Sequence, residues 1–415
     1  MTQAHAPQRR VVVTGMGAVT PIGNTVADFW AGVKAGTCGV GPVTGFPLDD
    51  LKILIAAQVK DFDHKARLKH FTRDKVIIHA DRYSWFAAAA ADEAIKQSGL
   101  KTPFENPYRT ACIVGSGGAG LVSVENAYRD LFILKKKATH PLTLLRIIGS
   151  SASAHVGIEF GVKGPTFATC SACSTATHAL GLARDYIRHG LVDVAIAGAS
   201  ESVINYGTMK AWQALHVLSP EGCFPFSKKR NGTVLGEGAG ILVLESYEHA
   251  VARGATILAE LKGYATTSDS GDMVNPSTEG PREAMRLALE DAGLAATDID
   301  YLNAHGTATA INDKNETAAI KQLFGDHARK LAISSTKSMH GHPLGAGGGI
   351  EAIACIKAMA EGFAPATIGL NDPDPDCDLD YVPNVGRAMP IKYAMSNSFA
   401  FGGLNAVVIF APPPA

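Results

Sequence analysis

The chain has 415 residues, of which 46% are hydrophobic and 19% are charged, and its formal net charge at pH 7 is −1. The length suffices for two compact domains or for one large unit with two cores, and the balanced charge argues against a nucleic-acid partner, which normally meets a basic excess. No apolar run approaches the roughly 18 residues of a membrane span, and the polar N-terminus carries no apolar signal core, so we expect a cytoplasmic protein without a membrane span.

Strands and amphipathic helices alternate along the chain. The first part predicts a helix at 81–99 and strands at 10–16, 110–117, 192–200 and 240–246. The second part predicts strands at 257–268, 298–306, 331–336 and 406–412 and helices at 281–293, 312–325 and 345–362. Long apolar strands separated by such helices indicate a layered α/β fold whose sheets are covered on both faces.

Two segments share one plan, which indicates an internal duplication. Residues 171–190 and 340–362 each place a reactive residue before small residues and a helix that ends in glycine. Such a duplication would bring two functional residues to equivalent helices that face each other across a pseudo-dyad. We place the halves at 9–258 and 259–413, with no flexible linker between them.

The seven cysteines are odd in number and scattered, which is typical of reduced thiols rather than of a disulfide framework. Only Cys170 and Cys173 lie close together, in TFATCSACSTATHALG (166–181). A metal knuckle usually needs a second cysteine pair, and a thioredoxin-like redox pair opens a helix early in a small domain. One nucleophile beside a bystander is therefore the favoured interpretation.

Cys173 is the better candidate for that nucleophile. It stands at the expected start of a helix, where the helix dipole and free N–H groups stabilise a thiolate. Cys170 lies one extended step earlier, where strand alternation predicts a buried and inert side chain.

Two histidines lie in segments that predict an active site. His305 follows a predicted strand in NAHGTATAINDKNE (303–316), and His342 lies with Lys337 in the glycine-rich turn STKSMHGHPLGAGG (335–348). A single histidine is usually structural. Two histidines at strand ends beside glycines favour hydrogen-bond donors to a carbonyl or carboxylate.

Together, the ordered segments SACS (171–174), NAHGTAT (303–309), TKSMHGH (336–342) and SFAFGG (398–403) resemble the β-ketoacyl-acyl-carrier-protein synthases. These are condensing enzymes of the thiolase fold, so the resemblance implies duplicated α-β-α-β-α halves. It also implies a Cys-His-His enzyme, rather than the Cys-His-Cys of thiolases or the Cys-His-Asn of the synthase III class. The segments are most similar to elongating type II synthases and to the condensing enzymes of rhizobial nodulation-factor lipids.

The resemblance assigns roles in catalysis. Cys173 would accept an acyl chain from carrier-protein pantetheine, while His305 and His342 would bind malonyl, promote loss of CO₂ and stabilise the enolate. Lys337 would support this site electrostatically, paired with Glu316. Neutral N–H donors in a dry pocket suit the negative charge that develops on the thioester oxygen.

The same resemblance assigns residues that bind substrate. Thr307 and Thr309 would hydrogen-bond the pantetheine arm. Phe401 would gate the pocket in a loop with Phe399 and Ala400, and its backbone N–H would form the oxyanion hole together with that of the nucleophile.

The resemblance further implies a monovalent cation, Na⁺ or K⁺, and no organic cofactor. The positions that match the cation site are Asn303, Glu351, Ser396 and Asn397. The expected partner is an acyl carrier protein that bears acyl and malonyl thioesters. We also expect a homodimer, in which the buried strand 192–200 pairs across a two-fold axis.

The chain departs from the family pattern at four positions: Ala400 replaces a glycine of the gating loop, Leu404 a threonine, His340 a threonine and Phe224 an arginine that meets the carrier protein. A glycine in the loop can use a positive φ that alanine adopts only at a cost, so we expect a stiffer gate. Lys228, Lys229 and Arg230 are candidates to replace the missing arginine, as is the basic run at 64–75.

Two other functions stay open. A chain-length partner subunit would bind acyl chains without catalysis, although such subunits usually lack the cysteine. A cysteine acyl-hydrolase would use Cys173 and one histidine, but it leaves the second histidine and Lys337 unexplained.

Overall fold

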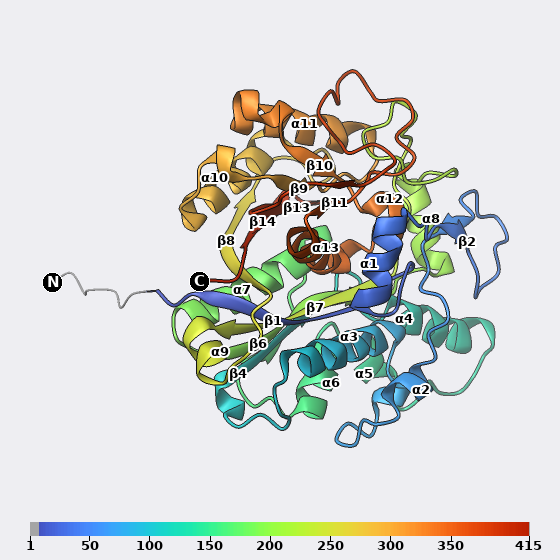
Figure 1. Ribbon diagram of the computed structural model, residues 1–415. Coiled ribbons are helices and arrows are strands. Elements are labelled where there is room, and N and C mark those ends of the chain that lie inside the picture. Colours follow the sequence, from blue (N-terminus) through green and yellow to red (C-terminus); the bar gives the residue numbers. More distant parts are fainter. Residues whose placement is uncertain (1–7, 415) are drawn as a thin grey trace.

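The computed structural model describes residues 8–414, and Figure 1 shows its arrangement. The strands of its first half are β1 (Val11–Val19), β4 (Thr110–Gly115), β5 (Thr166–Phe167), β6 (Val194–Glu201) and β7 (Gly238–Ser246). Those of its second half are β8 (Ala259–Ser268), β9 (Tyr301–Asn303), β10 (Ala332–Ser334), β13 (Ala394–Ala400) and β14 (Leu404–Ala411). Short pairs outside the main sheet are β2 (Gly41–Pro42) with β3 (Ile55–Ala56) and β11 (Phe363–Ala364) with β12 (Arg387–Ala388).

The two halves repeat one topology. The main sheet has the order β10-β9-β13-β14-β8-β1-β7-β6-β4-β5. In the first half β1–β7 and β7–β6 are antiparallel pairs, and β6–β4 and β4–β5 are parallel. In the second half β8–β14 and β14–β13 are antiparallel, and β13–β9 and β9–β10 are parallel. The halves join where β1 pairs with β8, at Val12↔Glu260 and Val13↔Ala259.

Helices form three layers around these strands. Between the two halves lie α7 (Thr175–Arg188) and α13 (Gly347–Glu361); outside the first half lie α3 (Arg82–Ser98) and α6 (Ser151–Phe160), and outside the second lie α10 (Glu279–Ala292) and α11 (Ala310–Phe324). One buried cluster fills the central layer and one fills each outer layer. The resulting α-β-α-β-α arrangement is the expected thiolase fold.

Two glycines let the central helices meet closely. A Cβ on Gly348 would lie 2.1 Å from Thr177 Oγ1 on α7, and a Cβ on Gly349 would lie 2.3 Å from the carbonyl oxygen of Gly240 on β7. Because side chains larger than hydrogen cannot fit there, α13 rests directly on α7 and β7. This contact brings the first turns of α7 and α13 together at the centre of the molecule.

The predicted elements are present with boundaries shifted by a few residues, but several others were not predicted. Among these are α1 (Val26–Ala35), α6, α8 (Tyr206–Ala214), β13 and the short helices α2 (His64–Leu68), α4 (Leu121–Tyr128), α5 (Thr143–Ile147), α9 (Tyr247–Ala252) and α12 (Lys337–His340). None of the helices within residues 8–414 has both the length and the apolar character needed to cross a bilayer. Residues 1–7, which entered the expectation about the N-terminus, lie outside the described residues.

The expectation for strand 192–200 is wrong. The corresponding strand β6 lies between β7 and β4, so both of its edges are already paired within the chain. The outermost strands of the main sheet are β5 and β10. A second copy could therefore extend the sheet only at one of those two strands.

Candidate active site

Cys173 sits on a tight turn that leads directly into α7. It lies in the 3₁₀ turn η4 (Ala172–Ser174), and the preceding Ala172 has φ +46°, an unusual conformation for a residue with a Cβ. Thr175 Oγ1 holds this turn closed, because it accepts from Ser171 N at 2.9 Å and donates to Ala172 O at 2.7 Å. The strained turn presents the Cys173 side chain, which is only 7% exposed, to an internal cavity.

The next residue, Ser174, joins the two halves. Its hydroxyl approaches the carbonyl oxygens of Ser398 at 2.9 Å and Leu404 at 2.6 Å, on either side of the turn between β13 and β14. The backbone beside Cys173 is thereby tied to the segment that carries Phe401.

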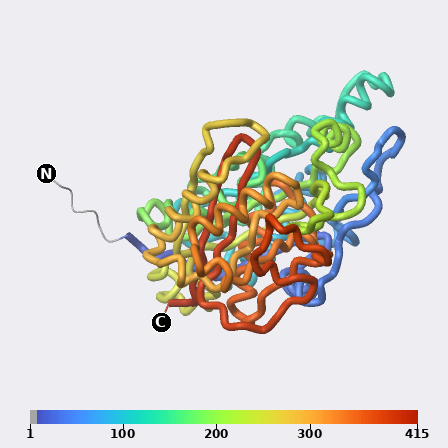
Figure 2. Tube along the Cα trace, turned by 90° about the horizontal axis from the view of Figure 1, so that it is seen from above, coloured from blue at the N-terminus to red at the C-terminus, as the bar shows by residue number. Residues whose placement is uncertain are grey.

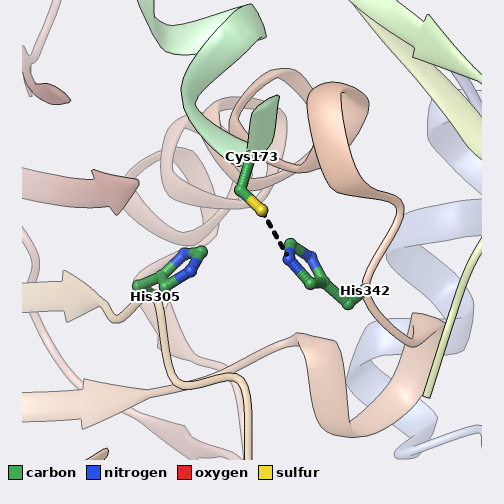
Figure 3. A group of neighbouring side chains, drawn as sticks. All are labelled: Cys173, His305 and His342. Carbon is green, nitrogen blue, oxygen red and sulfur yellow. Dashed lines mark hydrogen bonds between the residues drawn. The ribbon is translucent and has the colours of Figure 1, made fainter. Parts of the chain in front are cut away.

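Figure 3 shows the two histidines beside the sulfur. His342 Nε2 lies 3.1 Å from Cys173 Sγ, and the His305 and His342 ring centroids are 5.5 Å apart with their planes at 84°. The sulfur and one nitrogen from each ring all lie within 4.8 Å of one another. These ligand types would also suit a thiophilic divalent ion such as Zn²⁺.

Burial keeps both histidines neutral. It lowers the pKa of His305 and that of His342 well below the ordinary 6.5, and the charge of Lys337 lowers both further. Each buried Nδ1 has no hydrogen-bond partner. Because an unpaired N–H costs more than an unpaired lone pair, the proton belongs on Nε2 of each ring, where it is a donor toward the cavity.

The thiol of Cys173 is not acidified at rest. Burial raises its pKa to about 12, although the charge of Lys337 acts in the opposite direction. Loss of water on burial thus opposes the stabilisation that the start of a helix offers to a thiolate. The N–H of His342 remains in place to stabilise the thiolate that forms during reaction.

The expected pairing of Lys337 with Glu316 is wrong. The buried Lys337 ammonium pairs instead with Glu351 Oε1 on α13. Glu316 accepts from the backbone N–H groups of His305 and Gly306, each at 2.8 Å, and burial raises its pKa to about 7. Lys337 lies toward the central layer, whereas Glu316 belongs to the outer helix α11. Glu316 therefore holds the backbone of His305 from the outer layer.

The cavity brings the expected substrate-binding residues together. Its volume is about 270 Å³, and its lining includes Cys173, His305, His342, Thr307, Thr309, Phe399, Ala400 and Phe401. The hydroxyls of Thr307 and Thr309 lie 3.0 Å apart, and the Phe399 ring packs edge-on to His305 at 5.9 Å. A channel wall of this kind can hold an extended thioester arm whose reacting end meets the sulfur.

The sequence did not reveal every wall of this cavity. Trp212 in α8, His216 just after that helix and Met273 in an exposed loop also line it. One sequence signal was available for the loop: apolar Met273 and Val274 stand among glycine and polar residues and remain exposed. No motif marks Trp212.

Three of the four expected cation ligands share one side of the sheet. Asn303 and Ser396 are register partners on β9 and β13, and they face the helix that carries Glu351. Asn303 Oδ1, Ser396 Oγ and Glu351 Oε2 are all buried without hydrogen-bond partners. Oxygen donors of this kind fit a hard cation, and the shared Lys337 ammonium leaves no net negative charge, which favours a monovalent one.

Asn397 does not join these ligands through its side chain. Strand alternation turns it to the opposite face of β13, where Nδ2 donates to Glu316 Oε1 at 3.1 Å. Asn397 therefore supports Glu316, although its buried Oδ1 has no partner.

Two further expectations are corrected. Cys170 is exposed rather than packed, because β5 ends at Phe167 and no sheet continues to shield it. Ala400 is the last residue of β13, pairs with Leu404 and has no positive φ, so it carries no backbone strain. The positive angles of the gating turn belong to Gly402 and Gly403.

A buried carboxylate behind the nucleophile was also not predicted. Glu201, at the end of β6, accepts from the hydroxyl of Ser116 at 2.8 Å and from the backbone N–H groups of Gly117, Gly118 and Gly345 at 2.8, 3.1 and 3.0 Å. Gly117 O in turn lies 3.8 Å from Cys170 Sγ. Glu201 thus fixes the loop on which the cysteine turn rests.

The comparisons with known proteins assign this fold and site to a class. The chain matches the Beta-ketoacyl synthase, N-terminal domain over residues 8–250 and the Beta-ketoacyl synthase, C-terminal domain over residues 258–371. It belongs to the β-ketoacyl synthase family and is a condensing enzyme, an acyltransferase of fatty-acid or polyketide synthesis. The resemblance inferred from the motifs is confirmed.

Particular relatives are similar over nearly the whole chain. Nodulation protein E of Rhizobium meliloti (strain 1021) is 46% identical over 402 residues, 97% of this chain and 99% of that protein. The 3-oxoacyl-acyl-carrier-protein synthase 2 of Synechocystis sp. is 41% identical over 415 residues, 98% of this chain and 99% of that protein. A solved type II polyketide ketosynthase, in complex with its acyl-carrier protein and bound to the hexaketide, has a TM-score of 0.89 and 33% identity, covering 98% of this chain and 100% of that one.

Acyl transfer should mark Cys173 even though Cys170 is the more exposed thiol. Incubation with an acyl thioester of acyl carrier protein, followed by peptide mapping, should place the acyl group on Cys173, because only Cys173 faces the cavity. A small alkylating reagent should label Cys170 as well, and Cys170→Ser should leave acylation intact. An acyl group found mainly on Cys170 would contradict the assignment.

The pH profile should reflect neutral histidines. Their protonated forms accumulate only well below pH 6.5, so lowering the pH from about 8 to 6 should not reduce malonyl decarboxylation by titrating them. The measurement is the rate of CO₂ release in the Cys173→Gln variant, which isolates this step. An acid limb centred near 6.5 would mean that a catalytic histidine has its ordinary pKa.

Proposed function

We propose that the chain is an elongating β-ketoacyl-acyl-carrier-protein synthase that extends carrier-bound acyl chains by two carbons, in fatty-acid or in specialised lipid or polyketide biosynthesis. The observation that carries the proposal is the nucleophilic Cys173 within reach of two neutral histidines in one cavity. A single cysteine and one base would suffice for hydrolysis. The second histidine and the buried lysine fit decarboxylative condensation.

The residues divide the reaction into two stages. Cys173 Sγ attacks the acyl thioester, and the pantetheine thiol leaves with a proton, while the N–H groups of Cys173 and Phe401 hold the oxyanion. Malonyl thioester then enters, and its carboxylate leaves as CO₂. The Nε2–H groups of His305 and His342 stabilise the enolate oxygen. The enolate carbon then attacks the acyl carbonyl and releases Cys173 as a thiolate, which takes a proton from water.

An acyl carrier protein is the partner that this chemistry requires, and a structural neighbour is bound to its own. We propose that Thr307 and Thr309 hydrogen-bond the pantetheine arm along the cavity wall. Lys228 and Lys229 are exposed and offer positive charge to an acidic carrier, whereas Phe224 is partly buried.

We place the boundary between the two halves in the loop between α9 and β8, so that they comprise residues 9–258 and 259–413. We also propose that the enzyme is cytoplasmic.

The non-catalytic chain-length subunit is not favoured, because the cysteine and both histidines are present in a reactive arrangement. Product analysis distinguishes the proposed condensation from the acyl-hydrolase alternative, because condensation yields CO₂ and a β-ketoacyl product, whereas hydrolysis yields a free acid.

Removing single site residues should separate the two stages. Cys173→Gln should lose condensation and keep malonyl decarboxylation, because the histidine donors remain in place. His342→Ala should lower condensation by about a hundredfold or more, the usual effect of deleting an oxyanion donor. The assay combines CO₂ release with product detection, and near wild-type condensation by His342→Ala would refute the role of this histidine.

We propose that Asn303, Ser396 and Glu351 hold a Na⁺ or K⁺ ion, because their buried oxygens otherwise lack partners. Such an ion would join β9, β13 and α13 beneath the histidines. Removing both cations should therefore lower the thermal midpoint of unfolding, and Ser396→Ala should weaken this dependence. A midpoint that is identical in K⁺, Na⁺ and a large organic cation would argue against the site.

We propose a homodimer that forms along β5. Cys170, three residues beyond this edge strand, has its Sγ 3.8 Å from the carbonyl oxygen of Gly117, and the chain runs on from there into a projecting segment, teal in Figure 2, which comprises α4, the π-helical turn η3 (Arg129–Ile133) and α5. The segment exposes large apolar side chains at Tyr128, Phe132, Ile133, Leu134, Leu144 and Leu145. Apolar side chains gathered beside an open sheet edge are typical of an interface.

Light scattering tests the dimer. At micromolar concentration it should give about twice the chain mass of 43.4 kDa, and charged substitutions at Phe132 and Ile133 should halve the observed mass. A wild-type mass equal to that of one chain would contradict the proposal.

A further inference from the structure

Trp212 forms a fixed aromatic surface against the gating phenylalanine. The Trp212 and Phe401 rings are stacked, with centroids 5.6 Å apart and an interplanar angle of 28°. Both rings line the cavity that contains Cys173. Neither the family motifs nor the reaction scheme gives Trp212 a role.

The helix that carries Trp212 is firmly anchored. Asn205 caps α8 by accepting from Thr208 N at 2.8 Å. On the same helix, the side-chain oxygen of Gln213 accepts from the backbone N–H groups of Lys52 and Ile53, each at 2.7 Å. The neighbour of Trp212 is thus bonded to a distant segment of the chain, which fixes the position of the indole.

The turn that carries Phe401 has more freedom. It continues through Gly402 and Gly403, at φ +80° and +69°, and glycine can leave these angles without steric penalty. Its hydrogen bonds run from Gly402 N to Met273 O and from Asp269 N to Gly403 O, each at 2.9 Å, from Gly403 N to Ala400 O at 3.1 Å, and from Asn405 Nδ2 to Gly403 O at 3.3 Å. The stacked pair therefore joins a rigid element to a movable one.

The stacked position obstructs an acyl chain. Cys173 packs in an apolar cluster with Val203, Ile204, Met209 and Leu344, and none of these four residues lines the cavity. An acyl chain on Cys173 needs apolar space of this kind, and a long chain has to displace Phe401 to obtain it. Separating Phe401 from Trp212 costs free energy, and this cost opposes acylation more strongly as the acyl chain becomes longer.

We propose that Trp212 is a specificity-determining residue, which holds Phe401 in the closed position and thereby sets the acyl-chain length that Cys173 accepts. The inference rests on the gating role proposed for Phe401. Short chains react with the gate in place, whereas long chains react only when Phe401 leaves the indole. The reaction at the histidines does not involve this contact.

The test compares acylation rates for short and long carrier-bound chains. Trp212→Ala should raise the long-to-short rate ratio about two- to tenfold, the equilibrium factor that one aromatic pair supplies. Trp212→Phe retains an aromatic face and should stay near the wild-type ratio. Both variants should still release CO₂ from a malonyl thioester, which shows that the histidines remain in position.

Two controls make the result specific. Trp85→Ala removes a tryptophan that stacks on His64 at 3.7 Å outside the cavity, and it should not alter the ratio. Phe401→Ala removes the gate itself and should raise the ratio. A ratio that changes in Phe401→Ala but not in Trp212→Ala overturns the role of Trp212 alone, whereas no change in either overturns the gate as well.

Fluorescence gives a readout independent of turnover. The chain has three tryptophans, and only Trp212 lies against Phe401. Acylation with a long chain should change the emission of the wild type and of Trp85→Phe but not that of Trp212→Phe. A change of the same size in Trp212→Phe would come from Trp30 or Trp85 and would contradict the departure of Phe401 from Trp212.

Discussion

The hydroxyl of Ser174 fixes the position of the first half of the chain relative to the second half. One hydrogen is shared between the carbonyl oxygens of Ser398 and Leu404, and the next residue toward the N-terminus is the nucleophile. The sulfur belongs to the first half and both histidines belong to the second, so their separation depends on this joint and on the close glycine contacts of α13. A displacement of 1 Å between the halves would break the 3.1 Å contact between Cys173 and His342.

Burial then determines the chemistry of the assembled residues. It favours neutral histidines and a protonated thiol, and the buried Lys337 and Glu351 form an ion pair beside them. The positive charge of Lys337 and the negative charge of Glu351 largely cancel each other. Negative charge that develops on a thioester oxygen consequently meets oriented N–H donors and the Lys337 ammonium rather than bulk water, which is the environment in which such donors are most effective.

Much of this site could be predicted from the sequence, because its chemistry is local. Cys173, His305 and His342 each stand beside glycines or small residues where a strand or turn meets a helix, and the strand and helix pattern gives the layered fold. Pairings between distant segments were not predictable in this way. Lys337 and Glu316 lie on opposite sides of a sheet, and only the three-dimensional packing shows that Glu351 is the partner.

The remaining errors have the same origin. Alternation in TFATC predicts a buried Cys170 only if a strand continues there, and the actual strand is two residues long. The interior position of β6 follows from the order of strands in the sheet, which the sequence does not contain. Trp212 lies in a helix that was not predicted and meets a loop nearly two hundred positions away, so no local pattern could connect them.

The four donors around Glu201 have a consequence for how the protein is made. Ser116, Gly117 and Gly118 belong to the half that leaves the ribosome first, whereas Gly345 is synthesised much later. The nascent first half can therefore solvate its buried carboxylate with its own groups and hold the cysteine turn in shape while synthesis continues. Both histidines are synthesised after the cysteine, so the growing chain cannot carry out condensation until the second half has docked.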